Sequence, residues 1–129
     1  MSQVVVDILN RIPKMMRTAL LYQERCYQLL AKCLLEEAGF KCSIENICEY
    51  KIEGHYVGYG RIDIIAKRDN EMYIIEMKAN VGYQQTNKAK CQLKRYMIHY
   101  KTKRKLTGIL CMYNVGGSPV KIFVINPEK

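Results

Sequence analysis

Apolar residues recur with a helical period in two stretches of the chain and with an extended pattern in five others. The helical stretches are residues 17–38, after which Gly39 supplies a stop, and residues 84–100. A shorter apolar segment, residues 4–12, is expected to add one or two helical turns that end at Pro13. The extended stretches, separated by polar or glycine-containing turns, are residues 47–52, 60–67, 72–79, 107–113 and 120–125.

These elements predict one α/β domain, in which a helix is followed by three consecutive antiparallel strands, a second helix and two further strands. With 129 residues, the chain is long enough for one hydrophobic core and too short for two independent ones. We expect the domain to span residues 17–129, and residues 1–16 to precede it as an N-terminal extension.

The composition excludes several classes of protein. Hydrophobic residues make up 49% of the chain, which excludes general disorder, and no apolar run reaches the roughly 18 residues of a membrane-spanning helix. The six cysteines form no C-x-x-C pair, and the two histidines have no partner at ligand spacing. We therefore expect an intracellular protein without a membrane partner, with reduced thiols as in the cytoplasm or nucleus, and without zinc.

Charge is distributed unevenly along the chain. Residues 77–127 contain ten Lys and Arg and no Asp or Glu, so nearly all of the formal charge of +9 follows Glu76. This favours a polyanionic partner; the alternative is a solvated face, but solvated faces normally mix both signs. The basic residues that we expect to contact a nucleic-acid backbone are Lys88, Lys90, Lys94, Arg95, Lys101, Lys103, Arg104 and Lys105.

Two acidic residues, Asp63 and Glu76, interrupt strands that are otherwise almost continuously apolar. If the polar turn at residues 68–71 is symmetric, Asp63 lies opposite Glu76, and Lys78 projects from the same face two positions further on. Opposed carboxylates repel each other by roughly up to 1 kcal/mol, a cost that a bridging Mg²⁺ or Mn²⁺ would offset. The alternative is an ion-pair cluster on a solvated face, which an isolated pattern of this kind favours; the apolar setting favours the metal site.

Two polar residues on the predicted helices, Glu24 and Gln92, are each more typical of a structural role when taken alone. In combination they are more specific. Reading Glu24-x-x-Tyr27, Gly58-x-Gly60-Arg61-x-Asp63, Glu76-x-Lys78 and Gln92-x-x-x-Tyr96 in this order, the chain resembles the PD-(D/E)XK nuclease superfamily. It is most similar to the small GxxExxY family and next to the archaeal Holliday-junction resolvases. The resemblance covers residues 21–126, with Leu21 where the first family has glycine and Ile62 where the superfamily often has proline.

The resemblance implies a restriction-endonuclease-like core of αβββαβ order, with a mixed central sheet flanked by helices. It implies that Asp63, Glu76 and the backbone carbonyl of Met77 bind Mg²⁺, for which Mn²⁺ can substitute. Lys78 would orient and help activate the attacking water. Glu24 would support the metal site from the first helix, and Gln92 would hold Lys78 or the substrate phosphate.

The expected function is that of a metal-dependent nuclease, endo- or exonucleolytic, acting on nucleic acid and on DNA in the first place. The sequence leaves open whether the protein forms a homodimer. One alternative is a catalytically inactive nucleic-acid-binding module that retains the nuclease fold. Another is a basic interaction protein whose acidic residues and lysine form only an ion-pair cluster.

Overall fold

The structure is a computed structural model that describes residues 2–16, 24–79, 83–113 and 121–127 of the chain. Three helices and five strands make up these residues. In chain order they are α1 (Ser2–Met16), α2 (Glu24–Glu37), β1 (Lys41–Ile52), β2 (His55–Arg68), β3 (Glu71–Ala79), α3 (Tyr83–His99), β4 (Lys105–Tyr113) and β5 (Lys121–Ile125).

The five strands form one mixed sheet in the order β1-β2-β3-β4-β5. The first three strands are antiparallel neighbours, β3 and β4 are parallel, and β5 is antiparallel to β4. The parallel pair is joined by α3, because a crossover between parallel strands needs a long connection. Within the residues described, none of the helices has the length and apolar character needed to span a lipid bilayer.

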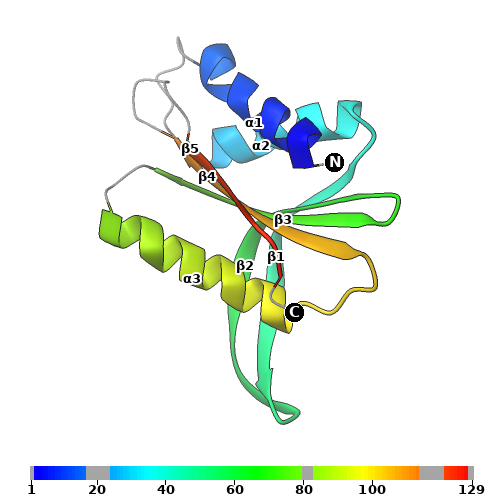
Figure 1. Cartoon of the computed structure of the whole chain (residues 1–129), viewed down its shortest axis with the longest axis vertical. Coiled ribbons are helices and arrows are strands. Elements are labelled where there is room, and N and C mark those ends of the chain that lie inside the picture. The colour runs from blue at the N-terminus through cyan, green and yellow to red at the C-terminus, as the bar shows by residue number, and fades with distance from the viewer. Residues whose placement is uncertain (1, 17–23, 80–82, 114–120, 128–129) are drawn as a thin grey trace.

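The helices cover the sheet on both faces (Figure 1). On one face, α1 and α2 bury Val5, Ile8, Leu9 and Ile12 together with Tyr27, Ala31 and Leu35. On the other face, α3 buries Ala89, Leu93, Tyr96 and Met97. The sheet therefore separates two apolar layers, and its central strands are buried on both sides, as the near-continuous apolar runs of β2 and β3 indicate.

The predicted α/β fold is confirmed, with its αβββαβ order and a mixed central sheet flanked by helices. Two details differ from the sequence-based expectation. The N-terminal helix does not end at Pro13 but continues to Met16. Helix α1, within the segment expected to precede the domain, contributes four buried side chains to the same core as α2.

Both strands of the first hairpin are longer than the apolar pattern predicts, since β1 begins at Lys41 and β2 begins at His55. The additional residues of β1 alternate between exposed and half-buried positions, and those of β2 are exposed apart from Gly58, so neither set has the burial pattern of a strand inside the core. Between Asp63 and the turn that joins them, these two strands pair only with each other, and this part of the hairpin extends away from the body of the sheet (Figure 1).

Candidate metal and active site

The candidate site lies where β2 separates from β3. Backbone pairing between these two described strands runs from Arg68 opposite Glu71 to Ile64 opposite Ile75. One residue beyond this pair, at Asp63 and Glu76, hydrogen bonds between backbone and side chains replace the backbone-to-backbone hydrogen bonds of the sheet. The amide N–H of Asp63 donates to Oε2 of Glu76 at 3.0 Å, and the amide N–H of Met77 donates to Oδ2 of Asp63 at 2.9 Å. Each carboxylate is thus held by the backbone of the other strand.

The separation coincides with a reversal of the two faces of the hairpin. Ile64 packs on the α1–α2 side of the sheet and Ile62 on the α3 side, although residues two apart on a regular strand share a face. Opposite Asp63, Glu45 has a positive φ of 54°. A strongly twisted, irregular position in both strands therefore turns the outer hairpin away from β3 and leaves the Asp63 amide without a β3 carbonyl.

Glu76 is the most deeply buried acidic side chain described, with 1% of its surface exposed. Burial raises the pKa of its carboxyl to about 9, with further contributions from the negative charge of Asp63 and from a hydrogen bond between the two carboxyl groups. The bond from the Asp63 amide and the positive charge of Lys78 act in the opposite direction but are weaker. In the absence of a cation, this pair retains a proton at neutral pH.

Lys78 lies on the same face of β3 as Glu76, as predicted. The parallel neighbour β4 fixes this: Glu76 pairs with Leu110 and Lys78 with Met112, and both β4 side chains pack against α3. Met77, between them, faces the α1–α2 layer instead. Asp63 and Glu76 are thus in direct contact, and Lys78, half-buried, projects from the same face of β3 as Glu76.

Helix α3 braces this region through Tyr96. The Tyr96 hydroxyl donates to the backbone carbonyl of Arg61 at 2.9 Å and accepts from Nε2 of Gln92 at 2.8 Å. Tyr96 is completely buried. Its burial, and to a lesser extent the negative charge of Glu76, raise the pKa of its hydroxyl. It is consequently a protonated donor that ties β2, two residues before Asp63, to the helix.

The amide nitrogen of Gln92 is thus directed at Tyr96. Its expected role of holding Lys78 or a phosphate stays a prediction. Gly60 makes the contact sterically feasible. A Cβ at that position would meet the Tyr50 hydroxyl and would lie 2.5 Å from Cε1 of Tyr96. The glycine in the Gly60-Arg61-x-Asp63 motif thus makes room for the tyrosine that supports the site.

The donor set fits Mg²⁺. After the two backbone bonds, each carboxyl has a second oxygen, Oδ1 of Asp63 and Oε1 of Glu76, and a repulsive pair of this kind is stabilised by a shared cation. Mg²⁺ is commonly bound through one or two carboxylates plus water. Among the described residues, no group of three or more His, Cys, Asp or Glu side chains is placed to hold a metal ion.

Glu24, which was expected to support the metal site, is the first residue of α2. Its side chain lies outside the part of the chain whose side chains are described. Sequence reasoning missed Tyr96 as a positioning residue because an apolar helix face with a tyrosine usually indicates ordinary core packing. Two signals were available: a glycine inside strand β2, which suggests a close approach, and the i,i+4 pair of Gln92 and Tyr96.

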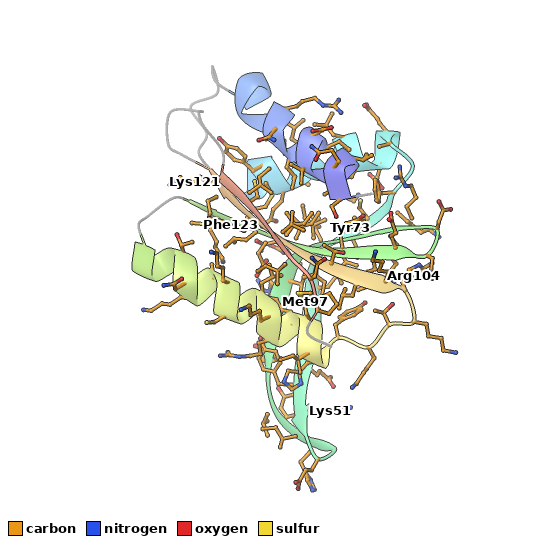
Figure 2. All side chains as sticks on the ribbon, in the orientation of Figure 1. Lys51, Tyr73, Met97, Arg104, Lys121 and Phe123 are labelled. Atoms are coloured by element: carbon orange, nitrogen blue, oxygen red, sulfur yellow. The ribbon has the colours of Figure 1, made fainter. Side chains whose placement is uncertain are left out.

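The eight predicted nucleic-acid-binding residues fall into two groups. Lys88, Lys94 and Arg95 are exposed on α3, while Lys90 lies over the ring of Phe123 at 3.9 Å from its centroid. Figure 2 shows Phe123 on β5 beside this helix. The second group, Lys101, Lys103, Arg104 and Lys105, adjoins the β2–β3 turn, where Arg104 Nε donates to the Asp69 carbonyl. That turn is five residues from Glu76 along β3, roughly 17 Å.

Comparisons with known proteins bear on the fold. No known protein family and no curated protein matches the chain. Among solved structures, the chain is similar to the crystal structure of a protein designated SSO0001, with a TM-score of 0.51 and 20% sequence identity. The match covers 95% of this chain and 66% of SSO0001, so this chain spans about two thirds of that protein's length. At this identity, the similarity shows a shared fold.

Proposed function

We propose that this chain is a metal-dependent nuclease of the PD-(D/E)XK type that hydrolyses phosphodiester bonds of nucleic acid, with DNA as its substrate. The observation that carries the proposal is a reciprocal pair of hydrogen bonds at the point where β2 and β3 separate: the Asp63 amide N–H donates to the Glu76 carboxylate, and the Met77 amide N–H donates to the Asp63 carboxylate. A buried carboxylate, Glu76, next to the half-buried carboxylate of Asp63 is costly to keep unless the pair performs chemistry.

In this proposal Asp63 and Glu76 hold a divalent cation, Mg²⁺ or Mn²⁺. When bound, such a cation would lower the pKa of the water that it binds and would offset the negative charge of the phosphate. Lys78 adds a second positive charge on the same face and orients the water. Tyr96 and Gln92 act as positioning residues, since they fix the backbone of Arg61 and therefore the position of Asp63.

The cationic side chains of α3 are expected to hold the substrate backbone. Lys88, Lys94 and Arg95 are exposed on the helix whose inner face covers Glu76, so a phosphate chain lying along α3 passes close to the site. Contacts of this kind recognise phosphate and not base sequence. We place the activity in a reducing intracellular compartment, because the described cysteines are unpaired.

Cleavage of plasmid and branched DNA in Mg²⁺, Mn²⁺ or EDTA tests the proposal. Asp63→Asn and Lys78→Met should abolish cutting and retain DNA binding, because each keeps the local shape and removes a charge. The matched controls are Asp69→Asn, on the exposed β2–β3 turn, and Lys67→Met, half-buried at the other end of β2. Both controls should cut like the wild type.

One observation favours a second candidate. The raised pKa of Glu76 means that the carboxyl pair is also stable as a proton-sharing unit without any cation. The chain would then be a non-catalytic nucleic-acid-binding module with the nuclease fold. DNA binding without cutting under every metal condition, by a protein whose Glu76 takes up no divalent cation, supports that module and contradicts the nuclease.

A further inference from the structure

Residues 46–61, the outer part of the β1–β2 hairpin, form an arm that extends beyond the sheet (Figure 1). Lys51 is near its outer end in Figure 2. A two-stranded hairpin alone is marginally stable, and α3 braces this one. Tyr50 stacks on Tyr96 with ring centroids 6.2 Å apart and contacts the ring of His99 at 5.1 Å, while the Lys51 amide N–H donates to Nδ1 of His99.

The bracing uses only one face of the arm. Cys48, Tyr50 and Gly60 point toward α3, so Ile47, Glu49, Tyr59 and Arg61 occupy the opposite, outer face. Of the eight large hydrophobic residues that are exposed in the described part of the chain, five lie on the arm, each with more than half of its surface accessible: Ile47 and Tyr59 on the outer face, and Ile52, Tyr56 and Val57 near the turn. Clusters of exposed apolar side chains on a well-anchored element mark interaction surfaces.

The arm is also electrically neutral. Its two basic residues, Lys51 and Arg61, are balanced by Glu49 and Glu53, and Lys51 Nζ lies 3.9 Å from Oε2 of Glu49. The rest of the chain therefore carries the whole formal charge of +9. Two copies of such a protein repel each other wherever cationic faces meet, and least where the arms meet.

We propose that the outer face of the arm is the interface through which a second copy of this chain binds, giving a two-fold symmetric dimer. A two-fold interface brings the same patch of both copies together and must be self-complementary. The arm meets this condition: apolar side chains of one copy, centred on Tyr59, pack on those of the other, and acidic and basic residues of equal number lie between them. Nucleic acid is disfavoured as the occupant because a neutral apolar surface offers little to phosphate.

The proposal is independent of the nuclease activity, and its test is the mass of the protein in solution. Sedimentation equilibrium of the wild type from about 1 to about 200 μM should show a reversible dimer with a Kd in roughly the micromolar range, as an interface of modest size gives. The dimer should persist at about 0.5 M salt, since apolar association is not screened. Tyr59→Glu should weaken it at least about tenfold.

Two matched variants complete the experiment. Tyr59→Phe should dimerise like the wild type, and so should Ile98→Glu, which places a charge on an even more exposed apolar residue of α3. Because Tyr59 is largely exposed, Tyr59→Glu should unfold at the wild-type temperature when both proteins are compared at concentrations well below the Kd, where both are monomeric. A wild type that is monomeric at every concentration overturns the proposal. So does a Tyr59→Glu variant with unchanged Kd, or one that loses DNA affinity with no change in mass, which would make the arm a nucleic-acid contact.

Discussion

The amide N–H of Asp63 donates to the carboxylate of Glu76, and the amide N–H of Met77, the residue after Glu76, donates to the carboxylate of Asp63. The two strands thus remain joined by four groups after their backbone ladder has ended. Each carboxylate has a structural task, the satisfaction of a buried N–H, besides any chemical one. The effect of a substitution at Asp63 or Glu76 on stability will therefore depend on whether the new side chain keeps an acceptor oxygen for that N–H.

Asp63→Asn and Asp63→Ala should separate these two tasks. Asparagine retains an oxygen for the Met77 amide, whereas alanine leaves that N–H without a partner, at a cost of about 1–3 kcal/mol. In urea unfolding of the cation-free protein, Asp63→Asn should be close to the wild type and Asp63→Ala less stable by that amount. Equal stability of the two variants would mean that water replaces the carboxylate as acceptor.

Glu76 should make the cation-free protein less stable as pH rises. Its folded pKa is raised to about 9 from the ordinary 4.5, so between these values the folded state holds a proton that the unfolded state has released. The stabilisation is complete below about pH 4.5 and is lost as pH approaches 9, with a slope of at most about 1.4 kcal/mol per pH unit. Urea unfolding in EDTA from pH 5 to 9 measures it.

The variant Glu76→Gln isolates that effect, because glutamine keeps an oxygen for the Asp63 amide and cannot ionise. Its free energy of unfolding should overtake that of the wild type as pH rises. Glu49→Gln, an exposed carboxylate on β1, is the control and should follow the wild-type profile. Parallel profiles for wild type and Glu76→Gln would contradict the raised pKa.

Gly60→Ala and Gly108→Ala should differ in cost although both glycines lie in strands. At Gly60 the new methyl group would meet the rigid rings of Tyr50 and Tyr96. At Gly108 it would lie 2.5 Å from Sδ of Met97, the end of a flexible side chain, and 3.1 Å from Cγ of Leu93. Overpacking costs about 1–3 kcal/mol, so we expect Gly60→Ala near the upper value and Gly108→Ala near the lower.

Gly60→Ala should in addition weaken divalent-cation binding, because the displaced Tyr96 ring releases the Arg61 carbonyl near Asp63. Thermal unfolding and a calorimetric Mg²⁺ titration of both variants measure the two effects. If Gly108→Ala weakens cation binding as much as Gly60→Ala does, Tyr96 is not a positioning residue.

The meeting of Asp63 with Glu76 could be predicted from the sequence because it depends on one symmetric turn. Arg68 opposite Glu71 sets the register, and the count to Asp63 crosses four regular pairs without a bulge. The position of Lys78 on the same face as Glu76 could be predicted because side chains alternate along a strand. The order of elements was equally accessible, because each stretch has a clear period and a turn signal at its end.

The remaining features depend on tertiary structure that local pattern does not encode. The positive φ at Glu45 and the change of face at Asp63 come from the twist of a hairpin that leaves its sheet, and alternation assumes that no such change occurs. The sequence pattern underestimates the extent of α1, because Pro13 predicts a helix end, whereas burial of Ile8, Leu9 and Ile12 in the core stabilises the helix as a whole.

The two cationic groups should contribute unequally to DNA binding. Lys88, Lys94 and Arg95 are exposed on α3 above the candidate site, and Lys101, Lys103 and Lys105 are exposed at the far end of β3. Each phosphate contact contributes about 0.9 to the slope of log affinity against log salt concentration. Replacing the three α3 residues with alanine should reduce the slope by about 2–3 and slow cleavage.

Replacing Lys101, Lys103 and Lys105 with alanine is the matched control, with the same loss of charge at a greater distance, and should change the slope by about 1 or less. Fluorescence anisotropy at several salt concentrations measures both slopes. The opposite order would place the substrate along the β2–β3 turn and away from α3.

Binding of a divalent cation should release a proton from the carboxyl pair. At pH 7, Glu76 is protonated in the cation-free protein because burial and the charge of Asp63 raise its pKa to about 9, whereas a carboxyl that holds Mg²⁺ must be ionised. About one proton should therefore leave for each Mg²⁺ bound, and affinity should rise roughly tenfold per pH unit between pH 6 and 8. Calorimetric titration with Mg²⁺ in two buffers of different ionisation enthalpy measures the number of protons directly. Asp69→Asn should behave like the wild type, and Glu76→Gln should neither bind the ion nor release a proton. Binding that is independent of pH, with equal heats in the two buffers, would show that the cation lies elsewhere and that Asp63 and Glu76 only join the strands.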